Sequence, residues 1–356
     1  MPPATPLGPV LRAAVVQAEV APTLAEGLAR TAALTREAAA RGARLVVFPE
    51  TWLPGYPAWL DVCRDAGLWA HPPVQAAHAR MAAESVAVPG PACRALGEAA
   101  RAAGVTLVVG VVERVDAGPG AGTLYNAALT FGPDGRLRNH HRKLVPTYTE
   151  RLVWGPGDAD GLRAVPVPLG VAGDAGDGAL GRALGDELGR ADDAPAARVG
   201  ALVCWEHWMP LARQAMHEQA EDVHAALWPT AHELLQVASR GYAFEGRCYV
   251  LAAGSLMRAR ALPPGLEPHP DRVAGPDALV LRGGSAVIGP DGHYLAGPVY
   301  DAPALLVADL DLGRVRAERM TLDVTGHYAR PDVLGLAVRR GGRGAGDDPI
   351  APPAAP

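Results

Sequence analysis

Cys204 lies where an apolar run gives way to a polar turn, a position that suits a nucleophile. The run is residues 197–203, and the turn continues as Trp205-Glu206-His207 before a segment of helical character. A buried strand delivers its last residue to the carboxyl edge of a sheet, where clefts form and the next helix offers unpaired N–H groups. A thiol there can be activated, whereas a free cysteine is most often a small buried apolar residue. The residues that could act with Cys204 decide between these interpretations.

Charged residues follow two other predicted strands. Glu50 closes the apolar run 45–48, and Lys143 closes the predicted strand 136–142, with Glu150 beyond it. A carboxylate at the end of a buried strand is costly to desolvate unless it is paired or held for use. Taken singly, Glu50 also fits a solvated turn, and Glu150 fits a surface pair with Arg151. Two carboxylates, an amine and a thiol at strand ends of one sheet system together predict an active site.

In these residues the chain resembles the carbon-nitrogen hydrolase superfamily. Its three signatures occur in order: Phe48-Pro49-Glu50, then His141-Arg142-Lys143-Leu144-Val145-Pro146-Thr147 with Glu150-Arg151, then Cys204-Trp205-Glu206-His207. Further details resemble the nitrilase branch: Pro54-Gly55-Tyr56-Pro57 with Trp59, Trp154-Gly155-Pro156-Gly157-Asp158, Pro210-Leu211-Ala212-Arg213, Trp228-Pro229, Ala243-Phe244-Glu245-Gly246-Arg247-Cys248 and Gly326-His327-Tyr328-Ala329-Arg330-Pro331. The resemblance therefore extends over about residues 10–332.

The resemblance implies a nitrilase, which converts an organic nitrile to a carboxylic acid and ammonia through a thioimidate and an acyl-enzyme on Cys204. In that chemistry Glu50 is the general base, and Lys143 stabilises the thiolate and then the negative nitrogen. Glu150 is expected to hydrogen-bond Lys143 and to help position substrate or water. No metal and no organic cofactor are implied, because the thiol, carboxylate and ammonium supply the nucleophile, the proton transfer and the charge stabilisation.

Four residues that flank the catalytic positions are expected to bind substrate: Tyr56, Trp59, Trp205 and His207. Aromatic rings there suit an apolar or aromatic nitrile, although core packing is the alternative for each of them. His207 has further alternatives, because it could bond backbone after the nucleophile or be exposed. The expected partner is therefore a small-molecule nitrile.

Alternating strands and helices must hold these residues. In the first half, apolar runs and helix-end signals predict strand 11–17, helix 22–41, strand 45–48, helix 91–103, strand 105–112, and strands 124–131 and 136–142 around Gly132-Pro133-Asp134-Gly135. The second half repeats the order with strand 199–203, helix 210–219, strand 224–228, helix 233–247, strand 249–254 and strand 285–288, followed by the turn Gly289-Pro290-Asp291-Gly292. Although the matching turns could be coincidence, the two halves predict an α/β fold, a four-layer α-β-β-α sandwich with pseudo-twofold internal symmetry.

One carbon-nitrogen hydrolase domain is expected over residues 1–332. Family members run almost directly from the strand 164–169 into the cysteine strand, so the Gly-, Asp- and Ala-rich residues 171–197 form an insertion, expected at the surface near subunit contacts. Weak periodicity within it predicts a helix at 180–188. The Pro-rich residues 258–277 are expected to form a mobile loop, and the Gly-, Pro- and Ala-rich residues 333–356 a disordered C-terminal tail.

Composition narrows the class of protein. A net charge of -5 with no long Lys/Arg block argues against binding of nucleic acid or an anionic membrane. The four cysteines are widely spaced and form no C-x-x-C pair, which argues against a structural zinc or a disulfide framework. The N-terminal residues lack signal-peptide character, and no run reaches the ~18 apolar residues of a membrane span. These features predict a cytoplasmic protein with reduced thiols.

Other functions remain compatible with parts of the pattern. An amidase of the same superfamily uses the same four residue types, although the context Cys204-Trp205-Glu206 favours a nitrilase, and a cyanide-converting enzyme is a further variant. A papain-like hydrolase would pair Cys204 with a histidine in a different fold, without a matching signature. A non-catalytic assembly protein of the same fold is a more remote alternative. Relatives form dimers that extend into larger spirals, so the resemblance also implies a homo-oligomer.

Overall fold

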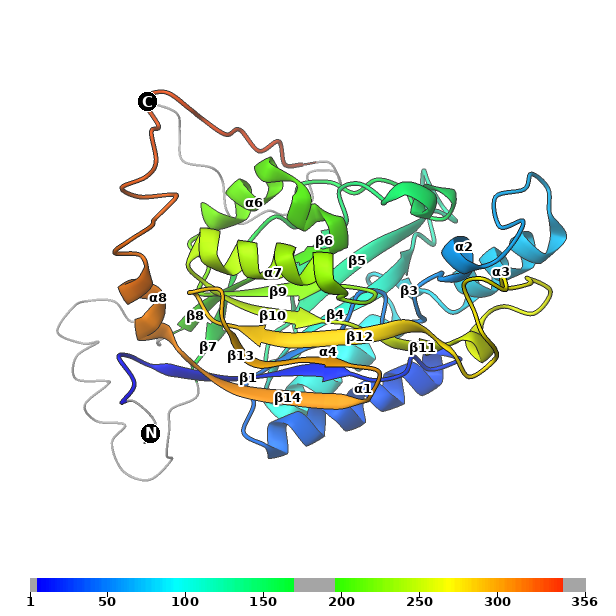
Figure 1. The fold of residues 1–356 in the computed structure, drawn as a ribbon, viewed down its shortest axis with the longest axis horizontal. Helices are drawn as coiled ribbons and strands as arrows, with labels where there is room; N and C mark the ends of the chain where they lie inside the picture. The colour runs from blue at the N-terminus through cyan, green and yellow to red at the C-terminus, as the bar shows by residue number, and fades with distance from the viewer. Residues whose placement is uncertain (1–4, 170–195, 342–356) are drawn as a thin grey trace.

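Two β-sheets packed face to face form the centre of the protein (Figure 1). The computed structural model describes residues 5–169 and 196–341. The strands of the first sheet, in spatial order, are β14 (Ala304–Asp311), β1 (Val10–Gln17), β2 (Leu45–Val47), β4 (Thr106–Arg114), β5 (Leu124–Phe131) and β6 (Leu137–Arg142), and the short β3 (Val86–Ala87) pairs with β4. Those of the second sheet are β11 (Leu256–Arg258), β12 (Leu279–Ile288), β10 (Tyr249–Ala253), β9 (Val223–Leu227), β8 (Ala196–Val203) and β7 (Val165–Pro168), and β13 (Tyr294–Tyr300) pairs with β12.

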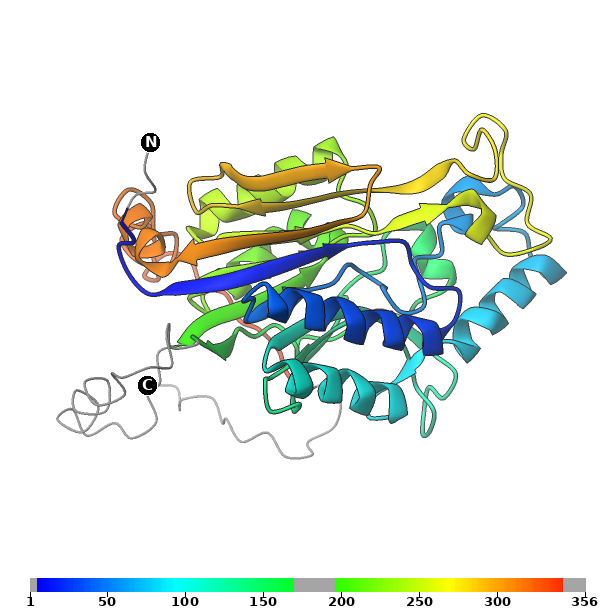
Figure 2. The same ribbon diagram turned by 90° about the horizontal axis from the view of Figure 1, so that it is seen from below.

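Helices cover the outer face of each sheet, which confirms the predicted four-layer sandwich. Figure 2 shows α1 (Leu24–Ala40) and α4 (Pro91–Ala103) side by side beneath the first sheet. The helices α6 (Pro210–His217) and α7 (Glu233–Gly246) cover the second sheet (Figure 1). The remaining helical segments are α2 (Trp59–Val62), α3 (Pro72–Ala83), α8 (Leu312–Glu318) and the 3-10 helices η1 (Tyr148–Leu152), η2 (Cys204–Trp208) and η3 (Ala259–Ala261).

The continuous apolar character of the strands follows from burial on both faces. Along β2, Leu45 and Val47 lie in the core between the sheets, whereas Val46 and Phe48 pack in the core beneath α1 and α4. Successive side chains of a strand point to opposite faces, so a strand between two apolar layers needs apolar residues at every position. Because both faces of the strand are buried, the first polar residue after the apolar run marks the end of the strand.

The predicted pseudo-twofold symmetry appears in the strand order. The order β1-β2-β4-β5-β6 in the first sheet corresponds to β8-β9-β10-β12-β13 in the second. The matching turns connect equivalent strands, β5 to β6 and β12 to β13. Each is closed by a hydrogen bond from the last glycine to the first, 2.9 Å for Gly135 N to Gly132 O and 2.8 Å for Gly292 N to Gly289 O. The two turns are thus equivalent in position as well as in sequence.

Several segments differ from the sequence-based expectation, lie outside the described residues or were not predicted. Residues 171–195 of the predicted insertion, which include the predicted helix 180–188, lie outside the described residues. Residues 196 and 197 belong to β8. The Pro-rich residues 258–277 contain η3 and otherwise no helix, and only their first residue is in a strand. The sequence-based expectation does not include α2, α3, β14 or α8.

The beginning of the expected disordered tail packs on the rest of the chain. Residues 333–341 contain no helix or strand, but Leu336 and Val338 pack against the core, and Gly341 N donates to Asp160 Oδ1 at 2.6 Å. Apolar side chains and a paired backbone explain why this part is held, and the expectation is corrected to that extent. Within the two described ranges, no helix has the length and apolar character needed to cross a membrane.

Candidate active site

The four predicted catalytic residues meet at the carboxyl edges of both sheets. Glu50 follows β2 and Lys143 follows β6 in the first sheet, Glu150 lies in η1, and Cys204 follows β8 in the second sheet. The predicted packing of two sheets face to face thus brings the thiol of one sheet to the carboxylates and the amine of the other. All four side chains are buried, each at most 3% exposed.

Lys143 lies between the two carboxylates. Its Nζ is 2.6 Å from Glu150 Oε2 and 3.3 Å from Glu50 Oε1. The Cys204 sulfur and an oxygen of each carboxylate lie within 4.8 Å of one another. Three such ligands could hold a metal ion, but the ammonium already supplies a positive charge at hydrogen-bond distance from both carboxylates. The arrangement therefore matches a thiol with a base and a cation.

Burial sets the protonation of the thiol and of Glu50. It raises the pKa of Cys204 well above its ordinary value, and the charge of Glu50 adds to this, although Lys143 opposes it. Burial also raises the pKa of Glu50 to about 7, against the charge of Lys143. Burial acts to lower the pKa of Lys143, but the charges of Cys204, Glu50 and Glu150 outweigh it and raise that pKa. At neutral pH the site thus contains a neutral thiol, an ammonium and a carboxyl group poised to exchange a proton.

Cys204 has an unusual backbone conformation for a side chain of its type. Its φ is 55°, in the left-handed region, which costs a residue other than glycine about 1–3 kcal/mol. The conformation turns the chain sharply from β8 into η2, and the N–H of Trp205 acts to lower the pKa of the thiol, which favours the thiolate. Strain at this position is thus associated with direct support of the anionic sulfur.

Two residues that sequence reasoning missed position Glu50. Asn126 on β5 donates from Nδ2 to Glu50 Oε1 at 2.6 Å. Gly110 on β4 leaves room for the turn, since a Cβ there would lie 2.3 Å from Pro49 O and 2.6 Å from the Glu50 Cα. The other carboxylate oxygen, Glu50 Oε2, is buried and makes no hydrogen bond within the described part of the chain. It is the oxygen available to accept a proton.

Glu206 connects the two sheets beside the site. Its Oε2 accepts from Val203 N at 2.7 Å, and its Oε1 accepts from Leu144 N at 2.8 Å. His141 Nε2 lies 2.9 Å from Oε2 and 3.0 Å from Oε1. Burial acts against ionisation, but His141 and the two backbone donors outweigh it and lower the pKa of Glu206. One carboxylate therefore ties the residue before Cys204 to the residue after Lys143, and only its place in the cysteine signature pointed to it.

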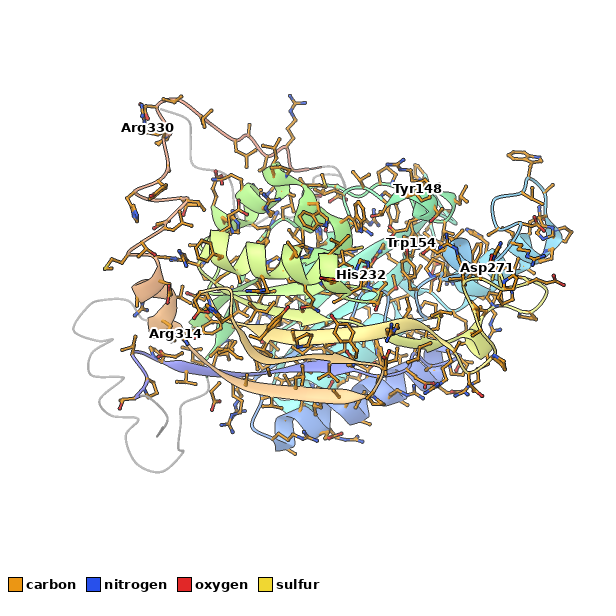
Figure 3. The ribbon with its side chains drawn as sticks, in the orientation of Figure 1. Tyr148, Trp154, His232, Asp271, Arg314 and Arg330 are labelled. Carbon is orange, nitrogen blue, oxygen red and sulfur yellow. The ribbon has the colours of Figure 1, made fainter. Side chains whose placement is uncertain are left out.

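The predicted substrate-binding residues separate into different environments. The Tyr56 hydroxyl donates to Glu150 Oε1 at 3.1 Å, and its ring packs edge-on against Trp154. Trp154, labelled in Figure 3, belongs to the same apolar cluster as Trp59 and Leu60 of α2. Tyr56 and Trp59 line a cavity of about 990 Å³, to which the four catalytic candidates contribute no lining residue. The cavity thus adjoins the site through Tyr56.

Trp205 and His207 lie outside that cavity. The Trp205 side chain is 53% exposed, beside the cysteine. His207 is buried, stacks on Trp228 at 4.7 Å between ring centroids, and has its Nδ1 2.6 Å from Cys204 O. Its expected role in substrate binding is corrected to packing and backbone support behind the nucleophile, because both ring nitrogens face other protein atoms.

Replacing Glu206 by glutamine tests its role as the connection between the sheets. In Glu206→Gln, one carboxylate oxygen is replaced by an NH₂ group. This group must face the N–H of Val203 or of Leu144, each of which donates to the carboxylate in the wild type. We expect the free energy of unfolding to fall by about 1–3 kcal/mol, measured by urea titration. The exposed Glu218, which accepts from Gln214 at 3.0 Å, provides the control Glu218→Gln, expected to change stability by less than about 0.5 kcal/mol. Equal effects of the two substitutions would contradict the assignment.

Comparison with known proteins agrees with the geometry. The chain is 39% identical over 331 residues to an aliphatic nitrilase of Sinorhizobium fredii, covering 92% of this chain and 95% of that one. It is 35% identical to a bifunctional nitrilase/nitrile hydratase of Lupinus angustifolius, covering 93% and 86%. A carbon-nitrogen hydrolase structure from Helicobacter pylori shares the fold, with a TM-score of 0.60 at 18% identity over 92% of this chain and 97% of that one. The family model for carbon-nitrogen hydrolases matches residues 12–320, and the chain belongs to that family.

Proposed function

We propose that this protein is a nitrilase, which hydrolyses an organic nitrile with two molecules of water to a carboxylic acid and ammonia. The observation that carries the proposal is the buried cluster in which the Cys204 sulfur and an oxygen of each carboxylate lie within 4.8 Å of one another, while the Lys143 ammonium hydrogen-bonds both carboxylates. The identity of 35–39% to proteins named nitrilases over most of the chain supports it.

The first half of the reaction forms a thioimidate. Glu50 removes the thiol proton as the Cys204 sulfur bonds to the nitrile carbon, and one carbon-nitrogen π bond becomes a lone pair on nitrogen. The Lys143 ammonium stabilises this negative nitrogen, and one donor of this kind contributes about 3 kcal/mol in a buried site. The proton held by Glu50 then passes to the nitrogen, which leaves a neutral thioimidate and a carboxylate ready to act again.

The second half releases ammonia and the acid. Glu50 takes a proton from a water that adds to the thioimidate carbon, and the tetrahedral intermediate expels ammonia once its nitrogen is protonated. A second water attacks the resulting thioester, and the carboxylic acid leaves as Cys204 regains its proton. Glu150 accepts a hydrogen bond from Lys143 and another from the Tyr56 hydroxyl. Tyr56 lies on the side of the site to which the proposal assigns the organic group.

The surroundings of Tyr56 favour a substrate with an apolar group of some size. The adjoining cavity of about 990 Å³ is lined on this side by Tyr56, Trp59, Met257 and Leu262. We therefore assign the organic group of the nitrile to that side of the site. The free thiols of all four cysteines fit a reducing compartment, and the proposal places the reaction in the cytoplasm.

Homo-oligomerisation is part of the same proposal. The outer helices α6 and α7 carry large apolar side chains that are exposed to solvent in the single chain: Leu211, Leu234, Val237 and Phe244. We expect sedimentation to give a dimer or a larger assembly. Sedimentation as a monomer at working concentration would refute self-association without affecting the chemistry.

Product analysis tests the activity directly. Aliphatic, aromatic and arylaceto nitriles and their amides are supplied to the wild type, Cys204→Ala and the matched control Cys93→Ala, and ammonia, acid and amide are measured. We expect acid and ammonia from nitriles, lost in Cys204→Ala and kept in Cys93→Ala, since Cys93 lies on the outer helix α4. Turnover of amides alone would make the protein an amidase. Because some relatives are named bifunctional nitrilase/nitrile hydratase, amide release from nitriles is also quantified.

The hydrogen bond from Asn126 predicts a pH effect. Glu50 must be ionised to act as a base, so activity rises as pH passes through its pKa of about 7. In Asn126→Leu the carboxylate loses a donor that lowers this pKa, and the acid limb of kcat/KM should move upward by about 1 pH unit. Asn139→Leu is the matched control, because Asn139 donates to Gly161 O instead. An unchanged limb in Asn126→Leu would contradict the role of Glu50.

A further inference from the structure

A row of buried polar side chains extends from the backbone of the nucleophile. His207 Nδ1 lies 2.6 Å from Cys204 O, and His207 Nε2 lies 3.1 Å from His224 Nε2. His224 Nδ1 lies 2.8 Å from Glu221 Oε1, and the Tyr242 hydroxyl lies 2.5 Å from Glu221 Oε2. Each of the four side chains is at most 2% exposed. The reaction described above uses none of them.

The first contact determines where the protons lie on the two histidines. A carbonyl oxygen only accepts, so His207 Nδ1 must carry hydrogen. Burial, with the charge of His224, lowers the pKa of His207 to about 3, and a neutral ring with hydrogen on Nδ1 accepts at Nε2. His224 Nε2 must therefore donate to it. Burial lowers the pKa of His224 as well, so the His224 ring is neutral and its Nδ1 is an acceptor.

The last contact then requires a donor on Glu221. Because His224 Nδ1 accepts, the hydrogen between it and Oε1 must belong to the carboxyl group, while the Tyr242 hydroxyl donates to Oε2. Burial raises the pKa of Glu221 to about 8, which agrees with a protonated acid at neutral pH. Gly200 provides the space for it, since a Cβ there would lie 1.7 Å from Oε1.

The chain of hydrogen bonds ends on the peptide group that serves the sulfur. That peptide carries Cys204 O on one side and the N–H of Trp205 on the other, and this N–H acts to lower the pKa of the thiol. A donor fixed on the carbonyl holds the plane of this peptide, and so fixes the orientation of the N–H beside the thiol. The residue concerned is the one with the strained φ of 55°.

We propose that Glu221 is a positioning residue of the active site, and that it acts as a neutral carboxylic acid whose proton orients His224, His207 and finally the peptide that supports the Cys204 sulfur. Ionised Glu221 would need a proton from His224 Nδ1. A neutral His224 with hydrogen there would turn the lone pair of Nε2 toward the lone pair of His207 Nε2, and the support of Cys204 O would weaken. Activity should therefore fall as pH rises through the pKa of Glu221.

Other charged groups around Glu221 contribute to its titration. They come from each neighbouring element: Arg198 on β8, His217 on α6, Asp222 before β9, Glu245 and Tyr242 on α7, Cys248 before β10, and Arg319 after α8, which donates to Glu221 O. Substitution of Glu221 itself leaves these groups in place. A comparison of two variants at this one position thus isolates the effect of its proton.

The test compares Glu221→Gln with Glu221→Leu. Glutamine reproduces the protonated acid, because its NH₂ donates to His224 Nδ1 and its oxygen accepts from Tyr242, whereas leucine can do neither. The first readout is the alkylation rate of Cys204 by iodoacetamide at pH 7, followed by mass spectrometry of its peptide. We expect Glu221→Gln to react within about threefold of wild type and Glu221→Leu about tenfold more slowly. Equal rates in both variants would overturn the proposal.

The second readout is the pH profile of kcat on the substrate that the product analysis identifies. Wild type should lose kcat above about pH 8, and Glu221→Gln should keep it to higher pH, with KM unchanged. An identical alkaline limb in the two proteins would overturn the proposal. This inference rests on the proposed function only for this readout, because alkylation needs the thiol and no substrate. If Glu221→Leu fails to fold, Glu221→Gln alone decides. Slow alkylation of this variant with a native circular dichroism spectrum would overturn the proposal, because it would show that the ionised carboxylate is required.

Discussion

The buried ammonium of Lys143 is the interaction on which the site depends. A charged amine that is 1% exposed is strongly destabilising unless it is paired, and here it lies 2.6 Å from Glu150 and 3.3 Å from Glu50. One positive charge cannot neutralise two carboxylates. The carboxyl with the longer contact, Glu50, consequently has its pKa raised to about 7 by burial. The lysine thus determines both that the pocket is stable and which carboxyl group exchanges a proton near neutral pH.

The repeated scaffold explains how such a site can be assembled from both halves of the chain. Phe48-Pro49-Glu50 follows β2, and Trp228-Pro229-Thr230 follows the equivalent β9. The Thr230 hydroxyl accepts from Arg282 N at 3.1 Å and donates to Gly283 O at 3.3 Å, a purely structural role. Likewise Ala18 follows β1 where Cys204 follows β8. Equivalent strand ends therefore carry chemistry in one half and support in the other, so the two sheets together yield one site.

Sequence reasoning succeeded where the signal is local. Doubly buried strands read as continuous apolar runs, and the two Gly-Pro-Asp-Gly turns mark hairpins, so the sandwich and the strand ends could be predicted. The helix α3, of which only Ala77 is buried, carries no comparable pattern. The strand β14 does begin with an apolar run, residues 304–308, and was missed all the same. Asn126 and the connecting role of Glu206 were missed for a related reason: their partners Glu50 and Leu144 lie 76 and 62 residues away. Contacts made only by folding leave no periodic trace in the sequence.

The total charge of the site stays the same through the steps of the proposed reaction. In the resting site Lys143 is positive, Glu150 and ionised Glu50 are negative, and the thiol is neutral, because burial raises its pKa. Transfer of the thiol proton to Glu50 moves the negative charge by a few ångströms and leaves the total unchanged. Attack on a nitrile moves it again, onto a nitrogen within reach of the same ammonium. Since no step adds a charge to the low-dielectric interior, the fixed dipoles around the site need little rearrangement between steps. A preformed thiolate is unnecessary in such a pocket, and the base that removes the proton becomes as important as the sulfur itself.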